Sequence, residues 1–148
     1  MRIIAGTYRS RQLKPLGRLR VRPTSDMLRE TLFNILGRGV EGRRFLDLFA
    51  GTGAVGIEAI SRGATDVFFV ESSRGAARLI AENLALLEVR EGARLMVGDA
   101  LAAIAKLESE QAVAFDFLFL DPPLICFSRA MASAIVECSS YQTSILHP

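Results

Sequence analysis

Hydrophobic positions along the chain follow two alternating periods. Four short apolar runs have the length of buried strands: 45–48, 67–70, 94–97 and 115–120. The segments between them place apolar residues at helical spacing: 54–62, 73–87 and 100–107. Strands that alternate with helices require right-handed crossovers, so the pattern predicts a Rossmann-like α/β fold, a parallel sheet with helices on both faces.

The first 40 residues follow a different pattern. Three short extended stretches are separated by glycine and proline, which predicts a small β-hairpin or meander: 3–5, 13–14 and 19–21. A helix is expected after Pro23, with Thr24 as its N-cap and Gly37 at its end. The helix is expected to pack on the body of the protein, and its residues at helical spacing are Met27, Leu28, Thr31, Leu32, Ile35 and Leu36.

The chain has 148 residues, half of them hydrophobic, which suits one compact domain. We divide it into three parts: a basic extension with its helix (1–40), a core (41–123) and a tail of different composition (124–148). No apolar run approaches the roughly 20 residues that cross a bilayer, and the N-terminus lacks the apolar stretch of a secretory signal. Cys126 and Cys138 are too few for a disulfide framework, so we expect a cytoplasmic protein.

The net charge is only +2, but the charges are unevenly distributed. Residues 1–44 hold eleven lysines and arginines against three acids, a net charge of +8, so the remainder carries −6. A basic segment on a mildly acidic body is typical of a protein that binds a polyanion. The alternative is a solvated basic arm that only keeps the protein in solution.

The turn after the first strand carries candidate binding residues. Residues 51–56 match the G-x-G-x-x-G dinucleotide fingerprint, and Glu71 lies near the distance expected of a ribose-binding acid. That pattern alone favours a nicotinamide-dependent oxidoreductase. However, Asp47 would repel a pyrophosphate, whereas it suits a cationic group, and Asp99 adds an acid suited to an adenine. S-adenosylmethionine fits this set; the alternative is that these acids merely cap helices.

The fourth strand ends at Asp121-Pro122-Pro123, which suggests the chemistry. An exocyclic amino group of a nucleobase is a poor nucleophile, because its lone pair is delocalised into the ring. If the Asp121 carboxylate and the Pro122 carbonyl accept its two N–H groups, the lone pair is directed at a methyl donor. Two prolines would fix this loop at little entropic cost. The alternative is an ordinary proline-rich strand exit.

Several segments together resemble a known family: 2–6, 22–24, 29–36, 47–53, 61–64 and 115–123. The chain resembles class I S-adenosylmethionine-dependent methyltransferases, and more narrowly the bacterial family that methylates guanine N2 in 16S ribosomal RNA of the small subunit. The opening segment is more diagnostic of this family than the glycine-rich turn, which many families share.

The resemblance implies roles for particular residues and a monomeric state. The methionine side of the cofactor would be lined by Asp47, Gly51 and Gly53, its ribose by Glu71, and its adenine by Asp99 and Ala100. The target base would be held by Asp121, Pro122 and Pro123. The basic arm would bind RNA through Arg9, Arg11, Lys14 and Arg22.

The resemblance ends after Pro123. Leu124 stands where the family has an aromatic residue that stacks on the base, and the tail is too short for the strands that complete the family's sheet. A frameshifted or shortened chain would explain both, and a catalytically weak or inactive fragment that binds RNA or cofactor is therefore an alternative function. Cys126, Cys138 and His147 lack the number and spacing of a metal site.

The apolar fourth strand is expected to be internal in the family's sheet. Its pattern places Phe115, Phe117 and Phe119 on one face and Leu118 and Leu120 on the other. Without the strands that follow it in the family, one of its edges would lack a partner, which predicts self-association through that edge.

Overall fold

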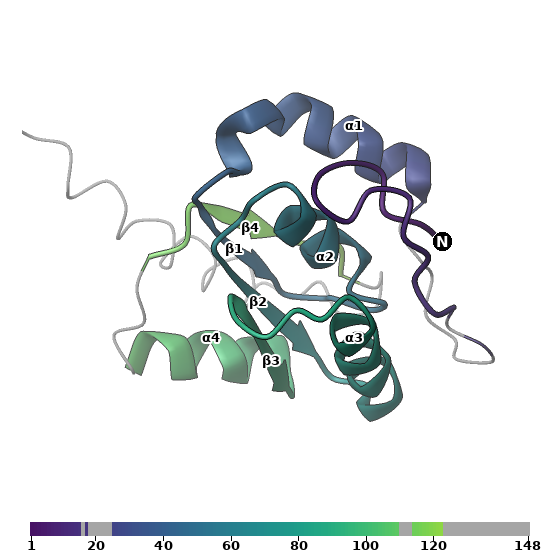
Figure 1. The fold of residues 1–148 in the computed structure, drawn as a ribbon. Helices are drawn as coiled ribbons and strands as arrows, with labels where there is room; N and C mark the ends of the chain where they lie inside the picture. The colour runs from purple at the N-terminus through teal and green to yellow at the C-terminus, as the bar shows by residue number, and fades with distance from the viewer. Residues whose placement is uncertain (16, 18–24, 110–113, 123–148) are drawn as a thin grey trace, which may run out of the picture.

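The computed structural model describes residues 1–15, 17, 25–109 and 114–122 (Figure 1). Its elements are α1 (Asp26–Leu36), the 3₁₀ helix η1 (Gly37–Val40), β1 (Arg44–Asp47), α2 (Ala54–Ser61), β2 (Asp66–Glu71), α3 (Arg74–Leu86), β3 (Ala93–Val97), α4 (Ala100–Ser109) and β4 (Phe117–Phe119). The predicted alternation of strands and helices is confirmed. None of the described helices is long and apolar enough to span a membrane.

The strands form one parallel sheet in the order β3-β2-β1-β4. Asp47, the last residue of β1, lies opposite Phe69 of β2 and Phe119 of β4. Because all strands run the same way, the segments that follow them emerge at one edge. Within the described residues β4 pairs only with β1; the predicted self-association through its other edge stays a prediction.

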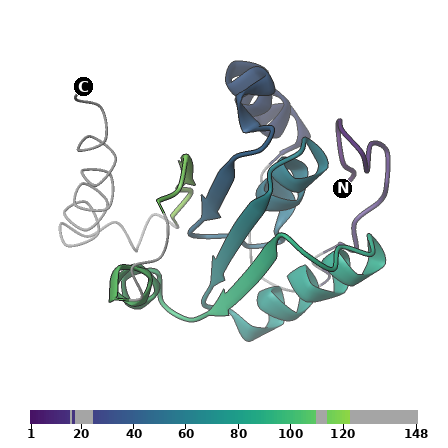
Figure 2. The same cartoon turned by 60° about the vertical axis from the view of Figure 1, so that its left-hand side comes forward.

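Helices cover both faces of the sheet, and each face has its own hydrophobic core. Figure 2 shows α4 on one side of the sheet and the helices α1, α2 and α3 on the other. Alternate residues of each strand point to opposite cores, as Val67 and Phe69 do against Phe68 and Val70. Burial on both faces explains why the strands have continuous apolar runs.

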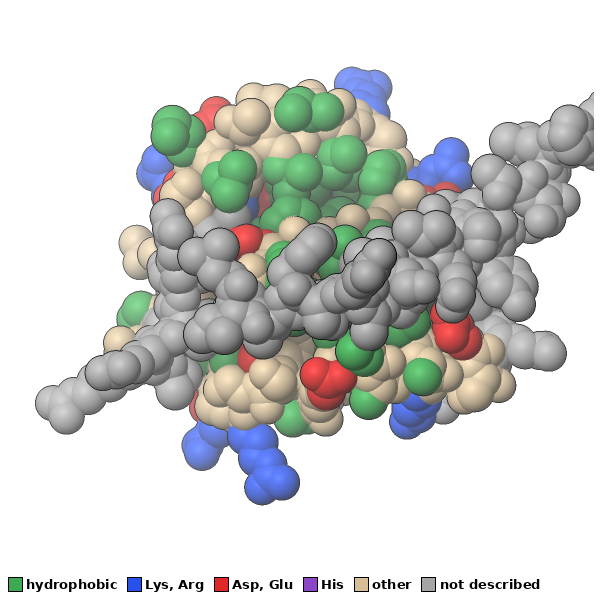
Figure 3. All heavy atoms as spheres, turned by 180° about the vertical axis from the view of Figure 1, so that it is seen from behind, with side chains coloured by type: hydrophobic (Ala, Val, Ile, Leu, Met, Phe, Trp, Pro, Cys, Tyr) green, Lys and Arg blue, Asp and Glu red, His purple; other side chains and the backbone are tan. Residues whose placement is uncertain are grey.

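The predicted N-cap of α1 is wrong, and only part of its apolar stripe packs on the body. Ser25, not Thr24, is the N-cap, and its hydroxyl accepts a hydrogen bond from the Leu28 amide at 3.2 Å; Thr24 itself lies outside the described residues. Met27, Leu28 and Ile35 are exposed by 76%, 51% and 79%. Seen from behind, hydrophobic side chains gather on the upper part of the molecule, where α1 lies (Figure 3).

The face of α1 that packs on the body includes Leu32 and Leu36 and also carries a charged residue. Arg29 and Phe33 are its buried residues. Phe33 stacks on Phe45 of β1, with ring centroids 6.3 Å apart, and the Arg62 guanidinium lies 4.8 Å from the Phe33 centroid. The apolar spacing therefore predicted the helix correctly, but an arginine with buried partners decided its orientation. Gly37 ends α1 as predicted.

The fourth strand is shorter than predicted, and the face assigned to Phe115 is wrong. Phe117 and Phe119 pack in the core beneath α1 and α2. Phe115 precedes the strand and packs edge-on against Phe68 in the opposite core, at 4.9 Å between centroids. The strict alternation predicted for 115–120 fails because β4 begins only at Phe117.

The N-terminal arm (residues 1–15) is an irregular hairpin. One antiparallel bridge joins Arg2 and Gln12, and the Ile3 amide donates to the Arg11 carbonyl at 3.0 Å. Ile3 and Leu13 are buried in the same core as α1 and α2. The predicted hairpin is thus present in its first two stretches, while 19–21 lies outside the described residues.

Two residues of α2 anchor this arm. The Glu58 carboxylate is fully buried and accepts hydrogen bonds from the Ile4 amide (2.8 Å) and the Ala5 amide (3.0 Å). One turn later, the Ser61 carbonyl accepts the Thr7 amide at 2.7 Å. The arm is therefore part of the folded domain rather than a solvated extension.

The anchoring leaves no room for a side chain at Gly6. Its φ is +83°, and a Cβ atom placed there would lie 1.7 Å from the Ser61 carbonyl oxygen. Gly42 also has a positive φ, +73°, but no atom would lie within 4 Å of a Cβ at that position. We predict that Gly42→Ala lowers the free energy of unfolding by about 1 kcal/mol, the cost of a left-handed alanine. Gly6→Ala should cost roughly 2 kcal/mol more, because the arm must leave Ser61.

Thermal unfolding of the two variants measures this difference, and amide exchange at Ile4 and Ala5 locates it. Equal destabilisation by the two substitutions would show that the arm is not held against α2.

Candidate active site

The glycine-rich loop between β1 and α2 is shaped by backbone conformations that favour glycine. Gly51 and Gly53 have φ values of 54° and 75°, and the Gly53 amide donates to the Ala50 carbonyl at 2.7 Å. A Cβ at Gly56 would lie 2.2 Å from the Phe69 ring. Glycine at these positions permits the tight turn and the close packing of α2 on β2.

Glu71, at the end of β2, holds this loop in place. Its carboxylate accepts hydrogen bonds from the Gly51 amide at 2.8 Å and from the Ser73 amide at 2.7 Å. The side chain is almost fully buried. Each carboxylate oxygen can accept more than one hydrogen bond, so Glu71 can order the loop and still accept ribose hydroxyls.

Asp47, at the end of β1, is a buried carboxylate with one unused oxygen. Oδ2 accepts the Gly56 amide at 3.2 Å, whereas Oδ1 has no partner among the described residues. Burial raises the pKa of Asp47 to about 7; the backbone amides of Gly56 and Phe49 oppose the rise, and the negative charges of Glu71 and Asp121 add to it. A cationic ligand group would satisfy the free oxygen and remove the charge repulsion.

Asp99 has a structural role that the sequence left open. Its Oδ1 accepts the amides of Leu101 (2.9 Å) and Ala102 (3.2 Å) at the start of α4. Asp99 is exposed, and Ala100 beside it is buried. For Asp99, therefore, the helix-capping alternative describes what the carboxylate does in this structure.

The exit of β4 lies beside the glycine-rich loop. The Leu48 amide, one residue after β1, donates to the Phe119 carbonyl at 3.2 Å. Asp121 lies two residues after Phe119 and is exposed. Its negative charge contributes to the raised pKa of Asp47. The structure thus brings Asp47, Glu71 and Asp121 to one edge of the sheet, as predicted. Pro123, Leu124 and Arg22 lie outside the described residues.

Among the predicted RNA-binding cations, Lys14 differs from the others. Lys14 forms an ion pair with Glu82 of α3 at 3.1 Å, whereas Arg9 and Arg11 are exposed and form no ion pair within the described part of the chain. No cluster of three metal-ligating side chains occurs in that part either; Cys126, Cys138 and His147 lie beyond it.

Three residues with roles around the site were missed from the sequence. Ser73 caps α3 and binds Glu71 through its amide, and a serine two residues after a strand-end acid is a usable signal for such a cap. The Thr52 hydroxyl lies 3.9 Å from the Met1 sulfur. Glu58 anchors the arm, and a single acid within the apolar run of α2 was the available clue.

A parallel sheet with a glycine-rich loop and acids at its strand ends is the architecture of the class I S-adenosylmethionine-dependent methyltransferases, and solved structures of a putative methyltransferase from Escherichia coli and a putative methylase from Haemophilus influenzae, both 33% identical, superpose on this chain with TM-scores of 0.74 and 0.68. Within this class, the chain belongs to the family described as conserved hypothetical protein 95, whose family model matches residues 1–139. The family predicted from the sequence is thereby confirmed. The prediction that the resemblance ends after Pro123 is wrong, because the family model matches the chain as far as residue 139.

Named relatives agree with this assignment. "Ribosomal RNA small subunit methyltransferase D" of Escherichia coli is 37% identical over 123 residues, covering 83% of this chain and 60% of the relative. "Putative rRNA methyltransferase YlbH" of Bacillus subtilis is 41% identical over 126 residues, covering 83% and 66%. The structure of a hypothetical protein from Thermus thermophilus superposes with a TM-score of 0.78 at 32% identity, covering 93% of this chain and 78% of that one.

The chain spans 60 to 66% of the length of the two curated relatives. The matched part includes the whole glycine-rich loop and the strand-end acids, so the site can be compared with theirs.

The buried Asp47 predicts a specific dependence of stability on pH. Its pKa in the folded state, about 7, lies above the ordinary value of 3.8, so between these values the folded state binds more protons than the unfolded state. The contribution of Asp47 to stability therefore falls as pH rises through this range and is constant above it. Relative to the parent, Asp47→Asn should become roughly 2 to 3 kcal/mol more stable between pH 5 and pH 8.

Denaturant unfolding of parent and variant at several pH values measures this difference. A difference that is the same at pH 5 and pH 8 would show that Asp47 is already ionised in the folded state at low pH.

Proposed function

We propose that this chain transfers a methyl group from S-adenosylmethionine to the exocyclic N2 amino group of a guanine in 16S ribosomal RNA. The observation that carries the proposal is the placement of Asp121 beside the glycine-rich loop, on the same sheet edge as the partly unsatisfied Asp47. The names of the relatives support ribosomal RNA as the substrate.

The residues at this edge suit the cofactor. S-adenosylmethionine supplies a methyl group activated by a sulfonium ion. The free oxygen of Asp47 would accept the cofactor's ammonium group, and Gly51 and Gly53 would let the backbone approach its methionine part. Glu71 would accept the ribose hydroxyls while it holds the loop. The adenine would lie by Ala100 and by Asp99, whose Oδ1 is committed to the α4 cap.

The target amino group would be held by the exit of β4. The Asp121 carboxylate and the Pro122 carbonyl would accept its two N–H groups, which draws the nitrogen toward tetrahedral geometry and frees its lone pair. Pro123 would restrict the loop, so that little entropy is lost when the base binds. Asp121 is exposed and therefore accessible to a base brought from solution.

The arm would bind the phosphates of the RNA. Arg9 and Arg11 expose their charges to solvent from a segment that α2 holds in place, and Arg22 and Lys14 would extend the same basic surface. A partner of this kind, the 16S RNA or the small subunit, places the protein in the cytoplasm.

A second candidate function is binding of RNA or cofactor without turnover. Leu124 favours it, because stacking of an aromatic side chain on a base contributes about 1 to 3 kcal/mol, and leucine has no ring to provide this.

Asp121→Ala tests the proposed chemistry. We predict that turnover falls by roughly 100-fold or more, since the group that orients the amino nitrogen is removed. The affinity for S-adenosylhomocysteine should stay unchanged, because Asp121 is assigned only to the base. Glu108→Ala, which removes an exposed acid from the far end of α4, is the control with the same change in charge.

Methyl incorporation into unmodified small-subunit RNA, together with calorimetry of cofactor binding, gives both values. Parental turnover in Asp121→Ala would refute the role of this residue. A parent that binds cofactor but transfers no methyl group would support the second candidate function.

We predict that the cations of the arm differ in their contribution to RNA binding. Replacing Arg9 and Arg11 by alanine should weaken RNA binding and flatten its salt dependence, by roughly 0.7 to 0.9 in the log-log slope for each phosphate that is no longer neutralised. Lys14→Ala should change the slope less, because Glu82 already neutralises this charge. Cofactor affinity should be unaffected in all variants.

Filter binding or fluorescence anisotropy between low and high salt measures these slopes. If the double variant keeps the parental slope, Arg9 and Arg11 do not contact phosphate.

A further inference from the structure

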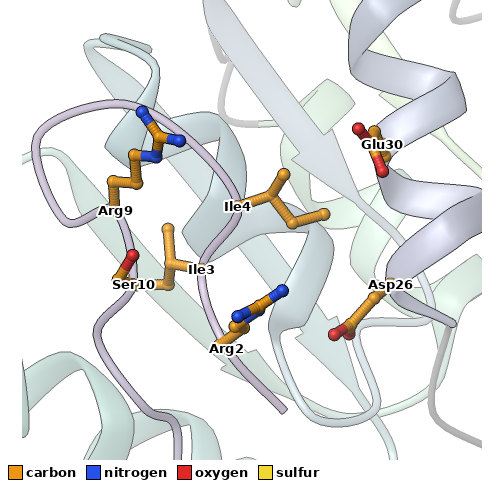
Figure 4. A pocket seen from close by; sticks show the side chains of 7 residues that line it. All are labelled: Arg2, Ile3, Ile4, Arg9, Ser10, Asp26 and Glu30. Carbon is orange, nitrogen blue, oxygen red and sulfur yellow. The ribbon is translucent and has the colours of Figure 1, made fainter.

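A cavity lies between the N-terminal arm and α1, apart from the candidate active site. It has a volume of about 260 Å³ and is lined by Arg2, Ile3, Ile4, Arg9 and Ser10 of the arm and by Asp26 and Glu30 of α1 (Figure 4). Its lining includes neither Asp121 nor any residue of the glycine-rich loop. The two places are neighbours, however, because Met1, next to Arg2, contacts Thr52 of that loop at 3.9 Å.

The walls of this cavity are fixed to each other and to the body. The buried guanidinium of Arg29, in the wall formed by α1, donates a hydrogen bond to the Arg2 carbonyl at 2.9 Å. The Ser10 amide donates to the Ile3 carbonyl at 2.9 Å, and the Ile4 amide donates to Glu58. A cavity held in this way exists before any ligand arrives, which lowers the entropic cost of binding.

The two sides of the cavity carry opposite charges. Arg2 and Arg9 come from the arm, and Asp26 and Glu30 come from α1 (Figure 4). Asp26 is engaged by Arg29. Glu30 is exposed, and no ion pair or hydrogen bond of its carboxylate is formed within the described residues. A ligand that carries both an anionic group and N–H donors would satisfy the two walls at once.

A nucleotide has this combination of groups. Its phosphates suit the two arginines, and its base offers N–H groups to the carboxylate. Guanine is the base whose Watson–Crick edge presents two adjacent N–H donors, N1–H and N2–H, which one carboxylate can accept together. The volume is near the lower limit for ligand pockets, about 300 Å³, and suits one base rather than a larger molecule.

We propose that this cavity binds an unpaired guanine nucleotide of the RNA substrate, a second base that is distinct from the one presented to Asp121. Glu30 accepts the N–H groups of the guanine edge, Ile4 contacts the base, and Arg2 and Arg9 contact the adjoining phosphates. The inference rests on the proposed RNA substrate and explains how the arm selects sequence as well as charge.

The test uses two labelled RNA heptamers, adenosines with one central guanosine or with one central inosine, which lacks the N2 amino group. Binding is measured in the Asp121→Ala background, so that the carboxylate proposed to hold the target base does not contribute. We expect the guanosine heptamer to bind roughly tenfold more tightly than the inosine heptamer. Adding Glu30→Gln should abolish this preference, whereas adding Glu91→Gln, the same charge change at an exposed position in the loop before β3, should retain it.

Arg9→Ala supplies the complementary result. It should weaken both heptamers alike and reduce the salt slope, because a phosphate contact carries no sequence information. Unchanged thermal melting of the Glu30→Gln chain confirms that the fold is intact. A guanosine preference that is absent at the outset, or that survives Glu30→Gln, overturns the proposal.

A methylation assay of the parent on unmodified small-subunit RNA distinguishes failure of the second-base site from failure of the proposed function. If the parent methylates RNA while the preference survives Glu30→Gln, only the second-base site is wrong. If the parent neither methylates RNA nor binds either heptamer, the proposed function and the second-base site both fail.

Discussion

The arrangement of the arm, α1 and α2 depends on one buried carboxylate, that of Glu58. Burying a charge is costly unless it is paired and hydrogen-bonded, and Glu58 is surrounded by donors. It accepts two backbone amides of the arm and the Arg62 Nε at 2.9 Å, and an Arg29 nitrogen lies 3.8 Å away. These groups come from the arm, from α1 and from the end of α2, so Glu58 holds the arm on α2 and lies beside the buried arginine of α1.

The candidate active site uses the opposite strategy, because its buried carboxylate is left partly unsatisfied. Asp47 keeps one oxygen without a described partner, and its pKa is raised to about 7. A buried carboxylate of this kind lowers the stability of the unliganded protein and favours binding of a cationic ligand. By comparison, both oxygens of Glu71 already accept a loop amide. The two acids look equivalent in the sequence but differ in what they have left for a ligand.

Features that depend on local periodicity were predicted correctly from the sequence. The four strands, the helices between them, the glycine-rich turn and the acids at the strand ends follow from hydrophobic spacing and from the conformational demands of glycine. Prediction failed where a distant contact overrides the local pattern. Part of the apolar stripe of α1, namely Met27, Leu28 and Ile35, is exposed, while the charged Arg29 is buried. Phe115 changes faces because the strand begins two residues later. Lys14 was counted as a free cation because its partner, Glu82, lies 68 residues away.

By itself, the sequence determined the fold class, the family and the residue types at the sheet edge, since these are encoded in short segments of the chain. Only the tertiary structure decided which of those acids is free to bind a ligand and which caps a helix, because that depends on the amides each carboxylate meets. The tertiary structure also decided that the arm is anchored on α2 rather than solvated, and that a cavity lies between the arm and α1. Those features arise from contacts between residues that are far apart in the sequence, such as the hydrogen bond from Ile4 to Glu58. A local sequence pattern does not reveal such contacts.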